Sequence, residues 1–368
     1  MPEDLDLGER DHDEEAELTA QERTVHTQGY DLSVNTLFEQ WTDKILVLPE
    51  FQREYVWDNA KASRLVESLL TGIPIPILYF AETPAATYEI VDGHQRVFSL
   101  VRFIDNQFAL TGLRLRNELR GLRFHRLPER DQRFLRTRVM RAIIISADSH
   151  PTMKFEIFER LNTGAVALNA QEIRNALYRG SLNDTLKLLE RNASFRICMD
   201  RSKPRARMVD RELVLRFLAL RDEFTDYRPP LVRFLNDYMS KNRLADTQWL
   251  GQRSAVFEQV SATAAGIYGA GAFRRTDASG EPLERNVNRA LFDTQMLVLS
   301  VSDQETALAA RVAVLEASAA LYDDPKFMDT ISRATGDKTR TRSRIRRFGA
   351  ALSHAGVPVD LKALSEGL

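Results

Sequence analysis

The sequence contains almost no cysteine: Cys198 is the only one in 368 residues. Disulfide scaffolds and cysteine zinc sites both need several thiols, so both are excluded. No apolar run reaches the roughly eighteen residues of a membrane-spanning helix. The first residues are acidic, whereas a secretory signal is basic and then apolar. We therefore expect a cytoplasmic protein with no membrane partner.

Several motifs of familiar chemistries are also missing. There is no glycine-rich loop that ends in Gly-Lys-Ser/Thr, no Gly-x-Gly-x-x-Gly after a strand and no Gly-x-Ser-x-Gly turn. The six histidines are scattered, without the i, i+4 spacing of a helical metal site and without an H-N-H nuclease pattern. The sequence therefore does not predict a P-loop enzyme, a dinucleotide-binding fold or a histidine-rich metal site.

Net charge is small, but it is unevenly distributed. Residues 1–23 hold ten acidic side chains against two arginines, which gives this segment a charge of −8. Because the whole chain carries −1, the remainder carries +7. A segment this acidic, with so few aromatic residues, is typical of a disordered tail. We expect such a tail over residues 1–28.

Arginines gather in two runs, at 114–141 and at 338–347. The first holds ten arginines against three acidic residues. Such a density attracts phosphate backbones at long range, although a solvated helix face produces the same pattern. The DNA contacts that we predict are Arg114, Arg116, Arg120, Arg123, Arg340, Arg342, Arg344, Arg346 and Arg347.

The most informative stretch is Asp92-Gly93-His94-Gln95-Arg96. It follows a strand-like run at 87–91 and precedes apolar residues at helical spacing. A glycine at such a strand–helix turn lets a ligand approach the backbone amides. An arginine in the first turn of a helix costs roughly 0.3–1 kcal/mol, whereas a charge-assisted bond to a phosphate or carboxylate contributes about 1.5–3 kcal/mol. Arg96 therefore indicates an anion site, with a pairing to Asp92 as the alternative.

A second loop, at 48–57, has the composition of a nucleotide contact. Gln52 and Arg53 supply donors, and Tyr55 and Trp57 supply rings on which a base can stack. Core packing of the two rings is an equal alternative. Together the two loops predict a nucleotide or phosphate pocket.

Two residues of the turn have open roles. Asp92 can hold Mg²⁺ through water beside phosphates, or it can fix the turn through its own backbone contacts. His94 can act as a base, or it can donate a hydrogen bond at the helix terminus.

The periodicity predicts an α+β domain with a small mixed sheet and helices, followed by an all-α domain. The expected boundaries are 29–165 and 166–368. In the first part we expect helices at 29–42 (with Ser33 as its cap), 59–71, 94–106 and 128–138, and strands at 44–48, 77–80, 87–91, 108–115 and 139–146. In the second we expect helices at 168–178, 182–190, 210–220, 231–241, 248–267, 288–301, 307–321 and 340–352, after one at 153–161.

Five motifs follow one another along the chain. They are Leu48-Pro49-x-Phe51-Gln52-Arg53-x-Tyr55-x-Trp57, Leu65-Val66-Glu67-Ser68-Leu69-Leu70-x-Gly72-Ile73-Pro74-Ile75-Pro76, Val91-Asp92-Gly93-His94-Gln95-Arg96, Phe158-Glu159-Arg160-Leu161-Asn162-Thr163-Gly164 and Leu168-Asn169-x-Gln171-Glu172-Ile173-Arg174-Asn175-Ala176-Leu177. In this order they resemble the N-terminal, GmrS-like domain of the GmrSD restriction endonucleases, whose fold is similar to the ParB and sulfiredoxin domains.

The resemblance implies a part in bacterial restriction or phage defence against foreign, often modified, DNA. It implies an NTP and Mg²⁺ as cofactors, bound by Asp92, Gly93, Gln95 and Arg96, with Gln52 and Arg53 on the facing loop. Asn162 and Thr163 are expected to support the pocket. The sequence departs from the family at His94, where a Gln is usual, which puts hydrolysis in doubt. It departs again at Ala165, where a second Gly is usual.

The first hypothesis is an NTP hydrolase. Asp92, His94, Gln95 and Arg96 would be its catalytic residues, and Tyr55, Trp57, Gly93, Asn162 and Thr163 would bind the nucleotide. The alternative is a catalytically silent, ParB-like DNA sensor or adaptor. Direct nuclease action by the Asp92 pocket is a third reading. Because an H-N-H pattern is missing, we expect DNA and a separate nuclease subunit as partners. The sequence leaves open whether the chain forms a homo-oligomer.

Overall fold

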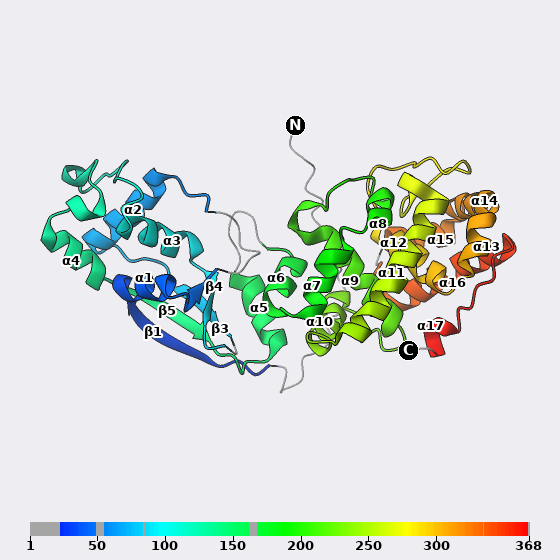
Figure 1. Ribbon diagram of the computed structural model, residues 1–368, viewed down its shortest axis with the longest axis horizontal. Helices are drawn as coiled ribbons and strands as arrows, with labels where there is room; N and C mark the ends of the chain where they lie inside the picture. Colours follow the sequence, from blue (N-terminus) through cyan, green and yellow to red (C-terminus); the bar gives the residue numbers. More distant parts are fainter. Residues whose placement is uncertain (1–22, 49–54, 84, 162–167, 334, 367–368) are drawn as a thin grey trace. The chain divides into compact units, whose positions relative to one another are not determined.

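The computed structural model describes residues 23–48, 55–83, 85–161, 168–333 and 335–366 (Figure 1). These residues form two compact units, one within 18–169 and the other within 170–368. Each unit has a hydrophobic core of its own. No helix among the described residues is both long enough and apolar enough to cross a membrane.

A five-stranded mixed sheet forms the centre of the first unit, in the order β1-β5-β3-β4-β2. Neighbours β1/β5 and β3/β4 are antiparallel, whereas β5/β3 and β4/β2 are parallel. This small mixed sheet confirms the predicted fold class of the N-terminal half. The strands are β1 Thr27–Ser33, β2 Leu46–Val47, β3 Leu78–Glu82, β4 Tyr88–Asp92 and β5 Val139–Ile145.

Helices cover the sheet and bury its apolar side. The core combines Phe80 and Ile90 of the sheet with the apolar faces of the helices, for example Val66 and Phe103. The helices α1 and α2 each contact both α3 and α4. The bounds are α1 Val34–Thr42, α2 Asn59–Thr71, α3 His94–Ile104, α4 Glu129–Thr137 and α5 Pro151–Leu161, with 3-10 turns at Asn117–Leu119 and Phe124–Arg126.

Two sequence expectations about this unit are wrong. The helix expected at 29–42 is capped by Ser33 as predicted, through a hydrogen bond from the Thr36 amide, but it begins at Val34 and not at residue 29. The residues before Ser33 form the edge strand β1 instead. The strand expected at 108–115 is also absent. There the Glu67 carboxylate accepts the amides of 114–116, so they are not available to a strand ladder.

Every named element of the second unit is helical, within the part of the chain that is described. This confirms the expected helical half. The expected helix at 307–321 is two helices that meet at Ala310, and α8, α15 and α17 were not expected. The bounds are α6 Ala170–Leu177, α7 Ser181–Leu189, α8 Ala193–Cys198, α9 Val209–Asp222, α10 Leu231–Lys241, α11 Thr247–Tyr268, α12 Arg289–Ser300, α13 Gln304–Ala309, α14 Arg311–Tyr322, α15 Pro325–Ser332, α16 Lys338–His354 and α17 Ala363–Glu366, with 3-10 turns at Ala206–Met208 and Gly269–Gly271.

Candidate functional site

Gly93 alone connects β4 to α3. It has φ 103° and ψ 7°, a left-handed conformation that favours glycine. A Cβ at this position would lie 2.3 Å from Cδ2 of Leu78 in β3. The first turn of α3 therefore lies directly against the sheet. The residue that caps this turn, Gly93, has no side chain.

The Arg96 side chain joins three segments at this junction. Its Nη2 lies 2.5 Å from Oδ2 of Asp92 at the end of β4. Its Nη1 donates to the carbonyls of Pro76 and Ile77, which lead into β3. The Arg96 side chain is only 11% exposed, whereas that of Asp92 is 45% exposed. The sequence left two roles for Arg96, an anion site or a pairing to Asp92, and the structure shows the pairing. The Asp92 carboxylate remains partly exposed to solvent.

Gln95 holds the second loop against the start of α3. Its Oε1 accepts hydrogen bonds from the amides of Val56 and Trp57, at 3.0 and 3.2 Å. The amide group of Gln95 also lies 3.4 Å from Nδ1 of His94. The structure thus brings the end of the 48–57 loop to the Asp-Gly turn through a side-chain-to-backbone clamp.

The two rings of this loop are packed rather than free. The Tyr55 hydroxyl lies 2.9 Å from Oγ of Ser99, and its ring centroid is 5.1 Å from that of Phe98. The guanidinium of Arg102 covers the Tyr55 ring at 4.6 Å. Trp57 packs against the core, and Nζ of Lys61 lies 4.7 Å from its ring. Core packing therefore accounts for both rings in this structure.

His94 is buried at the first position of α3, with 8% of its surface exposed. Loss of solvation lowers the pKa of its imidazole to about 4. The ring is therefore neutral at neutral pH, and it packs at 5.9 Å from the Phe98 ring. A base is most effective when its pKa lies near the working pH, so the neutral His94 is a weak one.

Four predicted nucleotide contacts lie outside the described residues: Gln52, Arg53, Asn162 and Thr163. Their roles stay predictions. Among the residues that are described, no three His, Cys, Asp or Glu side chains gather as a metal cage. Asp92 is thus a single carboxylate beside a helix N-terminus. That arrangement fits Mg²⁺, which proteins often hold by one or two carboxylates together with substrate phosphates.

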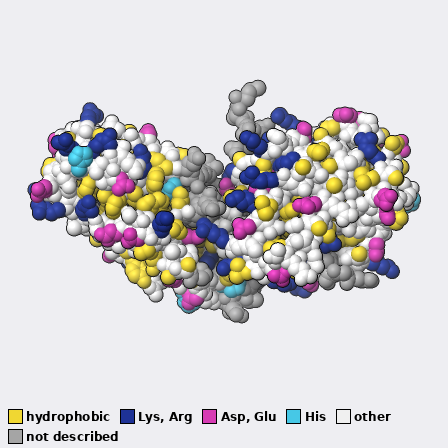
Figure 2. Space-filling model, viewed as in Figure 1, with side chains coloured by type: hydrophobic (Ala, Val, Ile, Leu, Met, Phe, Trp, Pro, Cys, Tyr) yellow, Lys and Arg dark blue, Asp and Glu magenta, His cyan; other side chains and the backbone are white. Residues whose placement is uncertain are grey.

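The first arginine run begins in an irregular segment around the two 3-10 turns of the sheet unit and continues through α4 into β5. Arg114, Arg120 and Arg123 are exposed there. Arg116 is paired, since its Nη2 lies 3.0 Å from Oδ2 of Asp131 and its Nε donates to Glu118. Figure 2 shows that basic side chains on the face in view are interspersed with acidic ones.

The second run lies on α16 and is divided between solvent and core. Arg342 and Arg346 are exposed. Arg340 and Arg347 are partly buried and pair at 2.7 Å with Asp329 and Asp324, respectively. Arg344 differs from all of these.

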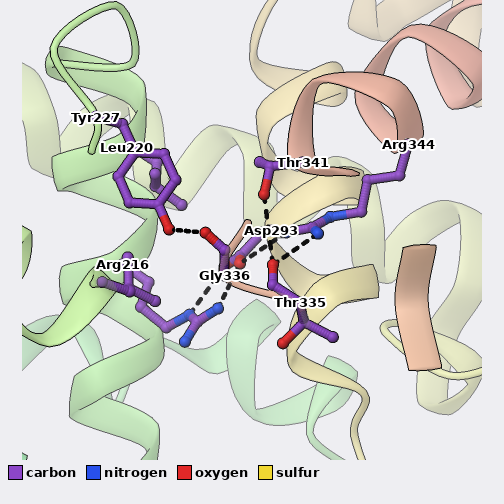
Figure 3. A pocket seen from close by; sticks show the side chains of 9 residues that line it. Arg216, Leu220, Tyr227, Asp293, Thr335, Gly336, Thr341 and Arg344 are labelled. Atoms are coloured by element: carbon purple, nitrogen blue, oxygen red, sulfur yellow. Dashed lines mark hydrogen bonds and ion pairs between the residues drawn. The ribbon is translucent and has the colours of Figure 1, made fainter. Parts of the chain in front are cut away.

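Arg344 is not a DNA contact, and that prediction is wrong. Only 1% of its surface is exposed, and its guanidinium lies 3.7 Å from Oδ2 of Asp293. Arg216 of α9 reaches the same carboxylate oxygen at 2.5 Å. Figure 3 shows both arginines directed at Asp293 in the interior of the helical unit. Arg344 also donates to the Thr335 carbonyl at 2.8 Å, so its role is to bind helices together.

Sequence reasoning also passed over Glu67 of α2. Its carboxylate accepts the backbone amides of Arg114, Leu115 and Arg116 at 2.9, 2.6 and 2.8 Å. Burial would raise its pKa, but these three hydrogen bonds and the charge of Arg114 outweigh burial and lower it. The spacing contained a signal, because Glu67 shares the inner face of α2 with Ser63 and Leu70.

A second omission concerns the polar residues of α6, the helix expected at 168–178, which carries most of the last of the five motifs. Arg174 is fully buried, and its guanidinium donates to Asn236, Gln171 and Glu212 at 2.8, 3.1 and 3.0 Å. Asn175 accepts from Arg211 at 2.7 Å. The polar residues of this motif therefore anchor α6 inside the helical unit.

Residues 34–179 match the family model described as GmrSD restriction endonuclease, N-terminal domain. No curated protein and no solved structure matches the chain. The matched range begins at α1 and ends after α6, so it includes most of the sheet unit and the first helix of the helical unit. The expected likeness to ParB and sulfiredoxin domains stays a prediction.

Proposed function

Because residues 34–179 form a GmrSD restriction endonuclease N-terminal domain, we propose that this chain is the nucleotide-binding component of a restriction system of that type. It binds an NTP with Mg²⁺ at the junction of β4 and α3 and hydrolyses it. It acts on DNA, and a separate subunit supplies the nuclease. The chain is thus an NTP hydrolase that controls cleavage rather than a nuclease itself.

The observation that carries the proposal is the geometry of the β4–α3 junction. A helix N-terminus carries a partial positive charge and unpaired amides, which favour a phosphate. Gly93 starts the first turn of α3 directly after β4, and Asp92 presents a half-exposed carboxylate next to that turn. Asp92 would hold a bound Mg²⁺, which would neutralise negative charge on the phosphates.

Each side chain of the turn has a distinct task in this proposal. Arg96 fixes the Asp92 carboxylate and adds positive charge behind it, and this charge favours an incoming phosphate chain. Gln95 ties the loop of Tyr55 and Trp57 to the same helix turn, so that the loop and the phosphate site move together. His94 is buried beside the turn with a neutral imidazole, so Arg96 is the positive side chain that contacts Asp92.

Those predicted DNA contacts that are exposed supply the DNA surface. They are Arg114, Arg120, Arg123, Arg342 and Arg346. Each arginine that neutralises a DNA phosphate releases a counterion, so the affinity falls as salt rises.

Phosphate release from each of the four NTPs tests this proposal, measured with Mg²⁺, with and without DNA. We expect turnover in the wild type and its loss in Asp92→Asn, which keeps the shape of the side chain but removes its charge. Arg96→Ala is expected to lose turnover as well. Because Arg96 also links β4 to the entry of β3, its melting temperature must be measured beside its activity.

Arg133→Ala is the matched control, because Arg133 is a 78% exposed arginine of the same unit. It is expected to retain full turnover. Unchanged turnover in folded Asp92→Asn and folded Arg96→Ala would refute the roles of these two residues.

A second candidate function is a DNA sensor or adaptor that binds nucleotide without hydrolysing it. One observation favours it: Gln95 is engaged by two backbone amides and His94 has a pKa of about 4, so neither is well placed to activate water. Equilibrium dialysis with labelled NTP separates the two functions. Tight binding with no phosphate release supports the sensor.

A further inference from the structure

Among the described residues, no strand lies beside the outer edge of β1. β1 is the end strand of the sheet, and residues 27–31 are exposed. Figure 1 draws it as the outermost strand of the sheet unit. A free edge is usually protected by a lysine, a proline or a bulge, because its amides and carbonyls can pair with another chain. β1, with the sequence Thr-Gln-Gly-Tyr-Asp-Leu-Ser, has no lysine, proline or bulge, and Asp31 is its one charged residue.

The hydrogen-bonding pattern shows which residues face outward. The Val34 amide donates to Arg138, and the Ser146 amide donates to His26. In an antiparallel pair, hydrogen-bonded and non-bonded residue pairs alternate. The even-numbered residues of β1 therefore bond to β5. The amides and carbonyls of Thr27, Gly29 and Asp31 point away from it, toward the open edge.

A second copy of β1 fits this edge in an antiparallel register centred on Tyr30. All seven residues then pair, and Gly29 lies opposite the second copy's Asp31. Both residues present outward amides and carbonyls, so each Gly29–Asp31 pair exchanges two hydrogen bonds. The arrangement is two-fold symmetric, as most homodimers are.

Charges on one face of the sheet favour this register. Arg141 of β5 lies directly opposite Asp31. Its Nη2 is 3.5 Å from the position that a Cβ on Gly29 would take, so the guanidinium lies over Gly29. The pair with Asp31 is loose, at 3.7 Å, and both side chains are more than 60% exposed. In the dimer, the second copy's Asp31 would stand opposite Gly29, and therefore beside this guanidinium.

On the other face of the sheet, this register brings the Tyr30 rings of the two copies together. Tyr30 is 42% exposed on the side of Leu32, which packs against the core. In the centred register the two Tyr30 side chains are directly opposite at a non-bonded position, where aromatic pairs stabilise a sheet.

From these observations we propose that β1 is a homodimerisation edge, at which two copies of this chain join their five-stranded sheets through antiparallel β1–β1 pairing centred on Tyr30. An edge contact of this kind is small, so the dimer is expected to form in the micromolar range. The proposal does not depend on the function of the β4–α3 junction.

Disulfide trapping in the full chain tests the register directly. Opposed non-bonded residues have Cα atoms about 4.5 Å apart, within the range that a disulfide spans. Tyr30→Cys is therefore expected to yield a covalent dimer on mild oxidation. The native Cys198 is buried and does not interfere.

Gln28→Cys is the matched control for this experiment. It carries an exposed thiol two residues away on the same face, but in the centred register it lies opposite Leu32 and far from its own copy. We expect cross-linking at least about tenfold slower than for Tyr30→Cys, as proximity controls the rate. Equal rates in the two variants, or no cross-link in Tyr30→Cys, would overturn the proposal.

Charge exchange gives a second, independent test, read by sedimentation equilibrium. Asp31→Arg and Arg141→Asp should each weaken the dimer by about tenfold, because each places like charges together. The double variant restores opposite charges and should recover most of the affinity. Both positions are exposed, so folding is expected to be unaffected. A wild type that stays monomeric at 200 μM (about the top of the working range) would also refute the dimer.

Discussion

Gly93 and Leu78 are in such close contact that a single methyl group between them would have no room. The Cβ of any other residue at position 93 would lie 2.3 Å from Cδ2 of Leu78. The turn that the proposed nucleotide site requires is thus fixed by packing from the neighbouring strand as well as by backbone conformation. Substitutions here separate these two contributions.

Gly93→Ala is expected to lower the free energy of unfolding of the sheet unit by about 2–4 kcal/mol. A left-handed conformation costs a residue with a side chain roughly 1–2 kcal/mol, and overpacking adds about 1–3 kcal/mol. Gly121→Ala is the control, because Gly121 has φ +81° but nothing within 4 Å of its Cβ position. It should show the conformational cost alone. Urea titration of both variants measures the difference, and equal losses would contradict the packing contribution.

Glu67→Gln is expected to destabilise the sheet unit by about 1–3 kcal/mol, because a carboxylate that accepts three backbone amides is replaced by a weaker acceptor. The folded pKa of Glu67 is lowered, so its stabilisation is present above the unfolded pKa and is lost as the pH falls. The 88% exposed Glu129 provides the control Glu129→Gln. Melting temperatures at neutral pH test this, and a similar small change in both variants would argue against it.

His94 is expected to make the protein acid-sensitive. Its folded pKa, about 4, lies below the unfolded value of 6.5, so between these two values the unfolded chain binds the additional proton. Stability should therefore rise with pH from 4 to 6.5, by an amount on the order of 1–3 kcal/mol. His94→Gln removes this group. The stability difference between wild type and variant should change across pH 4–6.5 and be constant above it. A constant difference throughout would mean that His94 is not desolvated.

Arg344→Ala is expected to cost the helical unit about 3–5 kcal/mol, because it breaks a buried cluster in which two arginines share the Asp293 carboxylate. Arg342→Ala, two residues away on the exposed side of α16, should change stability by less than about 0.5 kcal/mol. Thermal unfolding of the two variants provides the comparison. The reverse order would contradict the burial of Arg344.

Salt dependence should distinguish the DNA contacts from the structural arginines. If Arg342 or Arg346 neutralises a phosphate, its replacement by Ala should reduce the slope of log affinity against log salt by about 1. Replacement of Arg347 should change this slope less, because its guanidinium already forms an ion pair with Asp324. Fluorescence anisotropy with labelled duplex DNA measures the slopes. Identical slopes in all three variants would remove α16 from the proposed DNA surface.

The parts of the fold with a long, one-sided apolar pattern were predictable. The expected helix at 59–71 has the bounds of α2, since Asp58 caps its start and Gly72 ends it in a left-handed conformation. The expected strand at 87–91 and the turn at Gly93 also correspond to β4 and the start of α3. The cap of α1 at Ser33 and its apolar residues Val34, Leu37 and Phe38 were also predicted, but the residues before Ser33 were included in this helix although they form β1.

The errors at polar residues have a different physical origin. A count of arginines gives the charge of a segment, but it does not show which face of the helix each side chain occupies. Arg344 shares a face of α16 with the buried Thr341 and Phe348, three residues before it and four after. That spacing was available in the sequence, but its partner Asp293 lies on α12, and no local pattern connects the two. The contacts of Gln95 with the 56–57 backbone depend on tertiary structure in the same way.

The position of α6 bears on how this protein was inherited. The family segment reaches residue 179, yet its last helix lies within the helical unit, where Arg174 has its partners on α9 and α10. A recombination event that transferred the family segment alone would carry a buried arginine away from Glu212 and Asn236. Such a transfer is strongly selected against, because an uncompensated buried charge costs several kcal/mol. We therefore expect the sheet unit to have been inherited together with α6 and with the two helices that hold Arg174, α9 and α10.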